Sequence, residues 1–215
     1  MLKKIIYLNI AVFILIFIAA IVAFYGYNYP TRFRFVYHFK DYGLGFISLI
    51  LIGISLTAAL VSSLDIKNLD FKNKFFRIIL ALNSLVLFFT IYEGLDGFLK
   101  NRKVLTDLEN EYIQQAKIDI KNDQVTYRFA GGLALPMYTE KTIQKIDSVH
   151  HKYGVTYFNT GCILLEIENK AQEKYEITVK PYLEKRNGKD WESKMNNEIE
   201  KIKEKSLSGR IRKNN

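Results

Sequence analysis

The sequence has a single cysteine, Cys162, among its 215 residues. One thiol cannot form a disulfide within the chain, and it cannot provide the several cysteines of a structural zinc site. It does not identify the compartment, because a lone buried thiol is tolerated in reducing and oxidising surroundings alike. His150 and His151 do not form a metal site either, since adjacent helical residues point about 100° apart. We therefore expect no metal and no cofactor.

The sequence also lacks a glycine-rich phosphate loop. Gly131 and Gly132 are not followed by the Lys-Ser/Thr pair of such a loop, and they do not have the spacing of a dinucleotide fingerprint. The glycine pair therefore predicts a turn.

Excess positive charge is nearly absent from the second half of the chain. The net charge is +9, with 12 Lys/Arg and 5 Asp/Glu in residues 1–103 but 19 and 17 in residues 104–215. A nucleic-acid-binding protein concentrates basic residues on its water-soluble part. Here the excess lies beside apolar segments, where basic residues orient membrane helices and meet anionic lipid. The pattern indicates a lipid bilayer as partner and argues against nucleic acid.

Charged residues are missing from two long stretches, 5–31 and 42–64. A bilayer core about 30 Å thick needs about 20 helical residues, so we predict membrane spans at about 5–25 and 42–64. The first stretch is longer than the apolar core of a signal peptide and lacks a clean small-residue cleavage site, which favours a retained helix. A third span, at about 75–98, reaches sufficient length only if Arg77 extends to the interface. Residues 1–103 are thus predicted to form an α-helical transmembrane region.

Two features of these spans are candidates for function or packing. Glu93 and Asp96 are three residues apart near the end of the third span, and ionisable groups inside a membrane are functional candidates. The alternative is that both carboxylates reach water at the span end. Gly45, Leu49 and Gly53 share one face of the second span and predict a helix-packing surface; the alternative is that a membrane helix merely tolerates these glycines.

The loop between the first two spans alternates aromatic and basic residues. An extended segment would place its aromatic side chains on one edge and its mostly basic side chains on the other. Aromatic rings at headgroup depth, with arginines toward the phosphates, would anchor the loop at the membrane interface. The candidate interface residues are Arg32, Phe33, Arg34, Phe35, Tyr37 and Phe39.

The basic residues in the short loops do not decide the topology. With the N-terminus inside, six Lys/Arg lie on each side of the membrane. The first span usually dominates, and its Lys3-Lys4 start favours an N-terminus in the cytoplasm. Three spans would then place residues 104–206 outside the cytoplasm, attached to a multi-pass protein of the cell (inner) membrane.

Residues 104–206 have the pattern of a small soluble α+β domain. Periodicity, β-rich runs and turn residues predict the order α-β-α-β-β-α-α, in which the strands are Val125–Phe129, Val155–Phe158 and Cys162–Ile167. Gly161 ends the three-residue connection between the last two strands, and this predicts a hairpin. Residues 207–215 are basic and poor in apolar side chains, so we expect a disordered tail.

Part of this half resembles the FEKKY domain of bacterial, largely Bacteroidota, proteins. The resemblance covers about residues 105–205, outside the membrane spans, and at the naming pentapeptide only Lys152 and Tyr153 agree. It implies no known reaction and no catalytic residue. The residues that carry it are Lys152-Tyr153-Gly154-Val155, Asn159, Gly161-Cys162-Ile163, Tyr175 and Tyr182–Trp191.

These observations favour a membrane-anchored interaction or sensing module that binds a protein or a small ligand. A protein partner or a homo-oligomer is compatible with the pattern. The alternative is a membrane-associated enzyme that uses Cys162 as a nucleophile or the Glu93/Asp96 pair. A transporter or channel is disfavoured because there are only three spans and none has a strongly polar face. The sequence identifies no catalytic residue.

Overall fold

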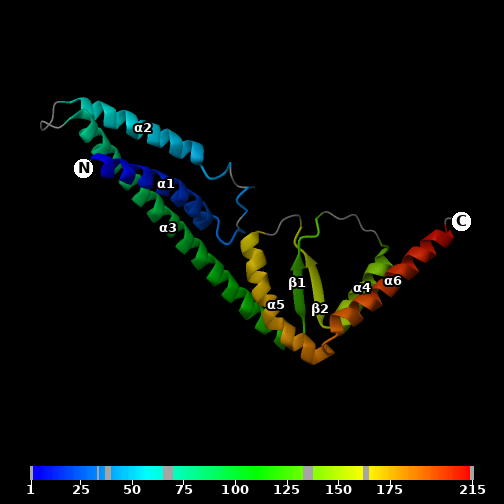
Figure 1. Ribbon diagram of the computed structural model, residues 1–215. Helices are drawn as coiled ribbons and strands as arrows, with labels where there is room; N and C mark the ends of the chain where they lie inside the picture. Colours follow the sequence, from blue (N-terminus) through cyan, green and yellow to red (C-terminus); the bar gives the residue numbers. More distant parts are fainter. Residues whose placement is uncertain are drawn as a thin grey trace. The chain divides into compact units, whose positions relative to one another are not determined.

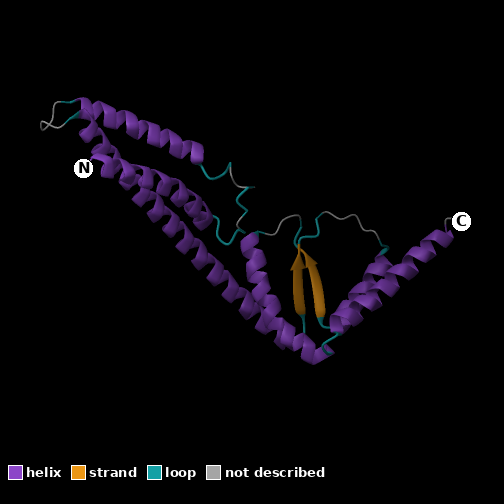
Figure 2. Cartoon of the chain, in the orientation of Figure 1, coloured by secondary structure: helices purple, strands orange, loops and turns teal. Residues whose placement is uncertain are grey.

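The computed structural model describes residues 2–32, 34–36, 40–64, 70–132, 138–161 and 165–213. Most of these residues are helical (Figures 1 and 2). The chain divides into two compact units, Met1–Val104 and Leu105–Asn215, and the division falls within α3. The elements in order are α1 (Leu2–Tyr27), α2 (Leu44–Ser63), α3 (Phe71–Lys121), β1 (Val125–Phe129), α4 (Glu140–Lys152), β2 (Val155–Asn159), α5 (Glu166–Asn187) and α6 (Trp191–Lys213).

Three helices are long and apolar enough to cross a membrane. They are α1, α2 and α3, and each contains one of the apolar stretches of the sequence. Helix α3 is 51 residues long, so it continues without interruption from the third apolar stretch into the polar second half. No Pro or Gly lies between Phe98 and Asp123, and this explains the continuation, since those residues most often end a helix.

Helices α1 and α3 run parallel and approach closely at small residues. Near their beginnings, the Asn9 side-chain amide donates a 3.0 Å hydrogen bond to the Phe76 carbonyl. Further along both helices, a Cβ added to Gly94 would lie 2.7 Å from the Ala23 Cβ, closer than real Cβ atoms come. Only a residue without a side chain permits this approach. The close backbones gain van der Waals contacts, which stabilise the association of apolar helices.

The packing surface predicted on α2 is not used in this way. A Cβ added to Gly45 or Gly53 would meet no atom within 4 Å. The glycines that permit close packing are instead on α1 and α3, where a Cβ added to Gly26 would lie 2.5 Å from the Gly94 carbonyl oxygen. The open space around Gly45 and Gly53 agrees with the alternative that α2 merely tolerates these glycines.

The second unit is built around a two-stranded parallel sheet. β1 pairs with β2 so that Val125 is opposite Val155 and Phe129 is opposite Asn159. Figure 2 shows the strands between α5 and α4, and the packing agrees, since α5 contacts β1 and α4 contacts β2. Parallel strands need a crossover connection, and α4 provides it. A two-stranded sheet is marginal alone, so these flanking helices are necessary for its stability.

The core of this unit lies where the strands meet α4, α5 and α6. Val125 and Val155 are almost fully buried and supply its centre. Trp191 at the start of α6 is 2% exposed. The buried residues of this core are Ala116, Val125, Val149, Tyr153, Val155, Tyr175, Val179, Leu183, Trp191, Met195 and Ile199.

An ion pair connects the end of α3 to α5. The Arg186 Nε donates to Asp123 Oδ1 at 2.5 Å, and the Tyr182 hydroxyl donates to the same oxygen at 2.5 Å. Arg186 also donates a 2.9 Å hydrogen bond to the Lys152 carbonyl at the end of α4. The guanidinium and the Tyr182 hydroxyl hold the pKa of the Asp123 carboxyl below its usual value. The Arg186 guanidinium thus holds the C-terminal ends of α3, α4 and α5 together.

One strand of the predicted organisation is wrong at its end. The expected strand Cys162–Ile167 is contradicted at its end, because Glu166 and Ile167 form the first turn of α5; residues 162–164 lie outside the described part. Glu168 explains the early start, since its carboxylate accepts the Leu165 amide at 3.1 Å and acidic groups stabilise a helix N-terminus. The described order from α3 onward is therefore α-β-α-β-α-α, and β1 and β2 form a parallel pair.

The C-terminal segment also differs from the prediction. Helix α6 continues to Lys213, through most of the stretch that was expected to be a disordered tail. Its residues contain no Pro, and its single glycine, at 209, does not end the helix. Low apolar content is therefore compatible with the end of a helix that is already nucleated by the buried turns around Trp191 and Met195.

Candidate functional site

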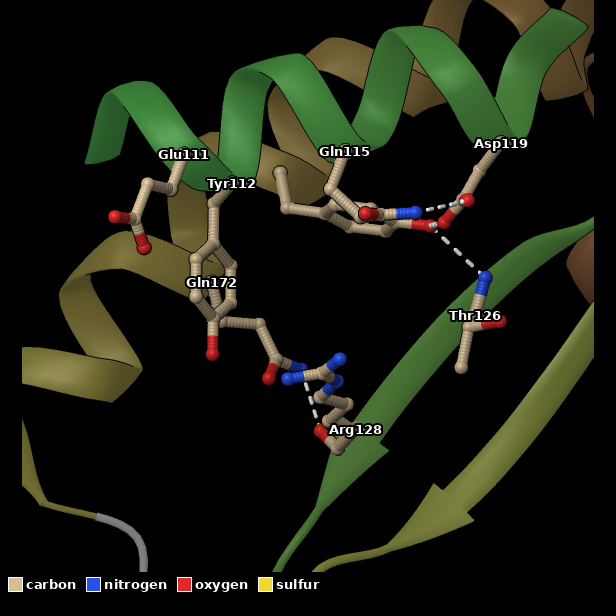
Figure 3. Close-up of a pocket in the computed structure, with 8 residues that line it drawn as sticks. Glu111, Tyr112, Gln115, Asp119, Thr126, Arg128 and Gln172 are labelled. Carbon is tan, nitrogen blue, oxygen red and sulfur yellow. Dashed lines mark hydrogen bonds between the residues drawn. The ribbon is translucent and has the colours of Figure 1, made fainter. Parts of the chain in front are cut away.

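A polar pocket of about 280 Å³ lies between α3, β1 and α5 (Figure 3). The pocket lies within the second unit, beside β1 on the side that α5 covers. None of its lining side chains is His, Cys or Ser. The lining residues are Glu111, Tyr112, Gln115, Asp119, Thr126, Arg128, Gln172 and Tyr175.

Regular spacing in α3 and β1 brings these side chains together. Glu111, Gln115 and Asp119 are each four residues apart, so they occupy one face of the helix. On β1, Thr126 and Arg128 alternate with the apolar positions, of which Val125 is fully buried in the core. The side of the strand that is not used for the core therefore faces the pocket.

The floor of the pocket is a hydrogen-bonded group centred on the buried Tyr175. Its hydroxyl donates to Asp119 Oδ2 at 2.5 Å and accepts the Thr126 amide at 2.9 Å. Gln115 donates to the other Asp119 oxygen at 2.7 Å. Tyr175 is 4% exposed, and burial together with the Asp119 hydrogen bond raises the pKa of its hydroxyl. The phenol therefore stays protonated at neutral pH and fixes the Asp119 carboxylate in place.

The opposite wall is formed by Arg128 and Gln172. The Arg128 guanidinium lies over the Tyr112 ring, 5.7 Å from its centroid, which is a cation–π geometry. Gln172 donates to the Arg128 carbonyl and, at 3.1 Å, to Glu176 Oε1. Because Gln172 bonds the edge of β1, α5 closes this edge of the sheet and leaves the Arg128 side chain at the pocket.

The chemistry of this lining favours binding over catalysis. The pocket contains one guanidinium, two carboxylates, two amides and two phenols, and these groups recognise polar ligands through hydrogen bonds and charge. It has no pairing of a Ser, Cys or Thr nucleophile with a base. Among the residues that the structure describes, no three His, Cys, Asp or Glu side chains are grouped so as to hold a metal ion.

The structure places Glu93 and Asp96 on α3 but does not pair them. The Glu93 carboxylate accepts a 2.7 Å hydrogen bond from the Tyr27 hydroxyl. Asp96 forms a 2.6 Å ion pair with Lys100, one turn further along the same helix. Each carboxylate therefore has its own partner, and the two do not form a joint acid–base pair.

The other candidates are only partly described. Cys162 lies outside the described residues, as do Phe33, Tyr37 and Phe39 of the aromatic–basic loop.

The remaining part of that loop is not extended. Phe35 and Val36 are in a turn, and the Phe35 carbonyl accepts a 2.8 Å hydrogen bond from the buried Tyr42 hydroxyl. A turn does not produce the predicted two-sided edge at these positions. Arg32 and Arg34 are both exposed.

No protein-family model, curated protein or solved structure matches the chain. The resemblance to the FEKKY domain therefore stays a prediction. The fold and the pocket define the chain as a mostly helical protein with three long apolar helices and a small α/β unit that carries a polar pocket.

Sequence reasoning did not find the pocket residues. A signal was present, because Glu111, Gln115 and Asp119 repeat every four residues opposite the apolar positions of the same helix. That spacing alone is also typical of a solvated helix face. What makes it a pocket is the approach of Gln172 and Tyr175, which are more than 50 residues away from those three side chains in sequence.

Proposed function

We propose that this chain is a membrane-anchored binding module whose second unit takes up a small polar ligand. Helices α1, α2 and the apolar part of α3, at about 75–98, cross the cell (inner) membrane. The parallel course of α1 and α3 supports this arrangement, since the first and third of three successive spans cross in the same direction. The uninterrupted α3 supplies both the last span and one wall of the ligand pocket.

The observation that carries the proposal is that some polar groups of the pocket lining are hydrogen-bonded to one another, while two of its charged side chains have no partner. Its floor is rigid because Tyr175, Asp119 and the Thr126 amide satisfy one another. The charged groups at its wall, Glu111 and Arg128, form no ion pair or hydrogen bond through their side chains with any described residue. Rigid groups beside unpaired charges are the arrangement of a preformed site for a polar ligand.

A ligand screen tests this proposal. We would reconstitute the full chain in lipid nanodiscs and heat it with single members of a panel of amino acids, sugars, organic acids and nucleosides. The emission of Trp191, the sole tryptophan, would report unfolding of the second unit. A ligand that binds the folded state raises the unfolding temperature by mass action.

The specificity of any stabilisation is tested with a matched pair of variants. Gln115→Tyr fills the pocket from α3, and we expect it to abolish the stabilisation. Gln114→Tyr adds the same ring at the neighbouring exposed position, which is not part of the lining, and should retain it. If no panel member stabilises the wild type, or if both variants respond as the wild type does, the proposed binding function is wrong.

We further propose that the N-terminus is cytoplasmic and that the second unit lies outside the cytoplasm. Support comes from the Lys3-Lys4 start and three crossings. A cysteine introduced at exposed Lys145, with Cys162 replaced by serine, would report the side. Labelling by a membrane-impermeant maleimide in intact cells is expected, while labelling only after lysis would require the opposite orientation.

A further inference from the structure

The pocket contains two side chains of opposite charge that do not pair with each other. Glu111 comes from α3 and Arg128 from β1, and Figure 3 shows them on different sides of the Tyr112 ring. Neither the Glu111 carboxylate nor the Arg128 guanidinium has a hydrogen bond or ion pair to another residue of the described chain; Arg128 has only the cation–π contact to Tyr112. Both ions are therefore available to a ligand.

The charges around the pocket disfavour ligands of a single sign. A simple anion could bind Arg128, but it would also face the carboxylates of Glu111 and Asp119. A simple cation could bind Glu111, but it would face the guanidinium. Like charges at close range oppose binding, whereas opposite charges with hydrogen bonds are the strongest polar contacts. A ligand with one group of each sign satisfies Glu111 and Arg128 together.

The size of the pocket limits the ligand further. Its volume of about 280 Å³ is just below the usual range for small-molecule sites, roughly 300–1,000 Å³. That space suits an amino acid or a dipeptide. The amide nitrogens of Gln115 and Gln172 donate to protein acceptors. A side-chain amide accepts only through its carbonyl oxygen, and these two oxygens can accept from a ligand ammonium.

We infer that the ligand is a small zwitterion, with an ammonium that binds Glu111 and a carboxylate that binds the Arg128 fork. The inference rests on the proposed ligand-binding function and specifies its chemical class. A free amino acid and a short peptide share this chemistry, and the two differ in the distance between the charged groups.

Calorimetric titration of the full chain in nanodiscs tests the inference with four probes. Norvaline carries both charges, pentanoate keeps only its carboxylate, and butylamine keeps only its ammonium. Alanyl-alanine carries both charges at the larger peptide separation. We expect norvaline or alanyl-alanine to bind at least about tenfold more tightly than pentanoate and butylamine, because each single-charge analogue loses one charge-assisted hydrogen bond. The tighter of the two zwitterions identifies the source as amino acid or peptide.

Two variants assign the charges. Arg128→Gln should reduce the affinity of the zwitterion to that of butylamine, and Glu111→Gln should reduce it to that of pentanoate. Arg128→Lys keeps the charge without the planar fork, so it should have an intermediate affinity. Glu109→Gln and Lys117→Gln, on the same helix but outside the lining, are the controls and should bind as the wild type does. Trp191 emission verifies that each variant is folded.

The outcomes separate this inference from the proposed function. If pentanoate or butylamine binds as tightly as the zwitterions, or if the variants do not change the preference, the zwitterion assignment is wrong. If an uncharged panel member binds the wild type but not Gln115→Tyr, the pocket is a binding site and only the ligand class is wrong. If neither the four probes nor the panel bind, both are wrong.

Discussion

Replacing Tyr175 by phenylalanine is the most direct test of how the pocket floor is built. The substitution keeps the buried ring and removes only the hydroxyl, which donates to Asp119 and accepts the Thr126 amide. The Thr126 amide would lose its acceptor, and a buried donor left without a partner costs about 1–3 kcal/mol. The hydrogen bond to the Asp119 carboxylate would also be lost, and such a bond is worth about 1.5–3 kcal/mol. Asp119 is only half-buried and keeps its bond from Gln115, so the two costs do not add fully.

We therefore expect Tyr175→Phe to lower the free energy of unfolding of the second unit by about 2–3 kcal/mol. The measurement is urea unfolding of the full chain in mild detergent, followed by Trp191 emission. Trp191 is suited to this purpose because it is the only tryptophan and is 2% exposed in the core of this unit.

Tyr112→Phe is the matched control, because it removes the same atom from another pocket tyrosine. The Tyr112 hydroxyl has no hydrogen bond to a described residue, and its loss should change stability by less than about 0.5 kcal/mol. If Tyr175→Phe differs from Tyr112→Phe by less than this amount, the hydroxyl is not the structural centre of the pocket.

Three further predictions concern the helices, the charged contact and a turn. Gly94→Ala should disrupt the α1–α3 contact and cost about 1–3 kcal/mol, whereas Gly53→Ala, with open space around it, should leave stability unchanged or raise it by up to about 1 kcal/mol. Denaturation in sodium dodecyl sulfate followed by circular dichroism compares them, and equal midpoints would contradict the close approach. Because Arg186 lowers the pKa of Asp123 in the folded state, the stability from this carboxylate is complete above its ordinary pKa of 3.8 and is lost as the pH falls through the lower folded value. Asp123→Asn should thus lose less stability than the wild type on acidification to pH about 3, and parallel acid limbs would refute this contribution. Gly161 has a φ of 101°, so Gly161→Val should destabilise the unit by about 1–2 kcal/mol in urea unfolding, and unchanged stability would exclude this backbone conformation.

Local sequence patterns were sufficient for most of the elements. The predicted strand Val125–Phe129 is confirmed, and β2 extends only one residue beyond its predicted end. Alternation and helical periodicity depend on neighbours a few residues apart, so the sequence contains the information directly. The same holds for the three apolar helices, because their length and composition are local properties.

Long-range contacts decided what local patterns could not. The β-rich run around Val155 does not show which strand it pairs with, and only the contact with Val125 across the α4 crossover places it parallel to β1. Likewise, nothing near Gly94 or Gly53 in sequence distinguishes a glycine in close helix contact from one in open space. The distinction depends on where α1 comes near α3, a contact between residues about 70 positions apart.

The sequence alone determined that the chain has three helices able to cross a membrane, followed by a mixed helix–strand unit, since hydrophobic runs and periodicity are encoded locally. Only the tertiary structure produced the pocket. There, Gln172 of α5 bonds the Arg128 carbonyl, Tyr175 bonds Asp119 on the floor, and the Arg128 guanidinium lies over the Tyr112 ring. Tertiary packing decides whether a charged side chain has a partner within the protein or can bind a ligand. The neighbours of a residue in sequence do not reveal this.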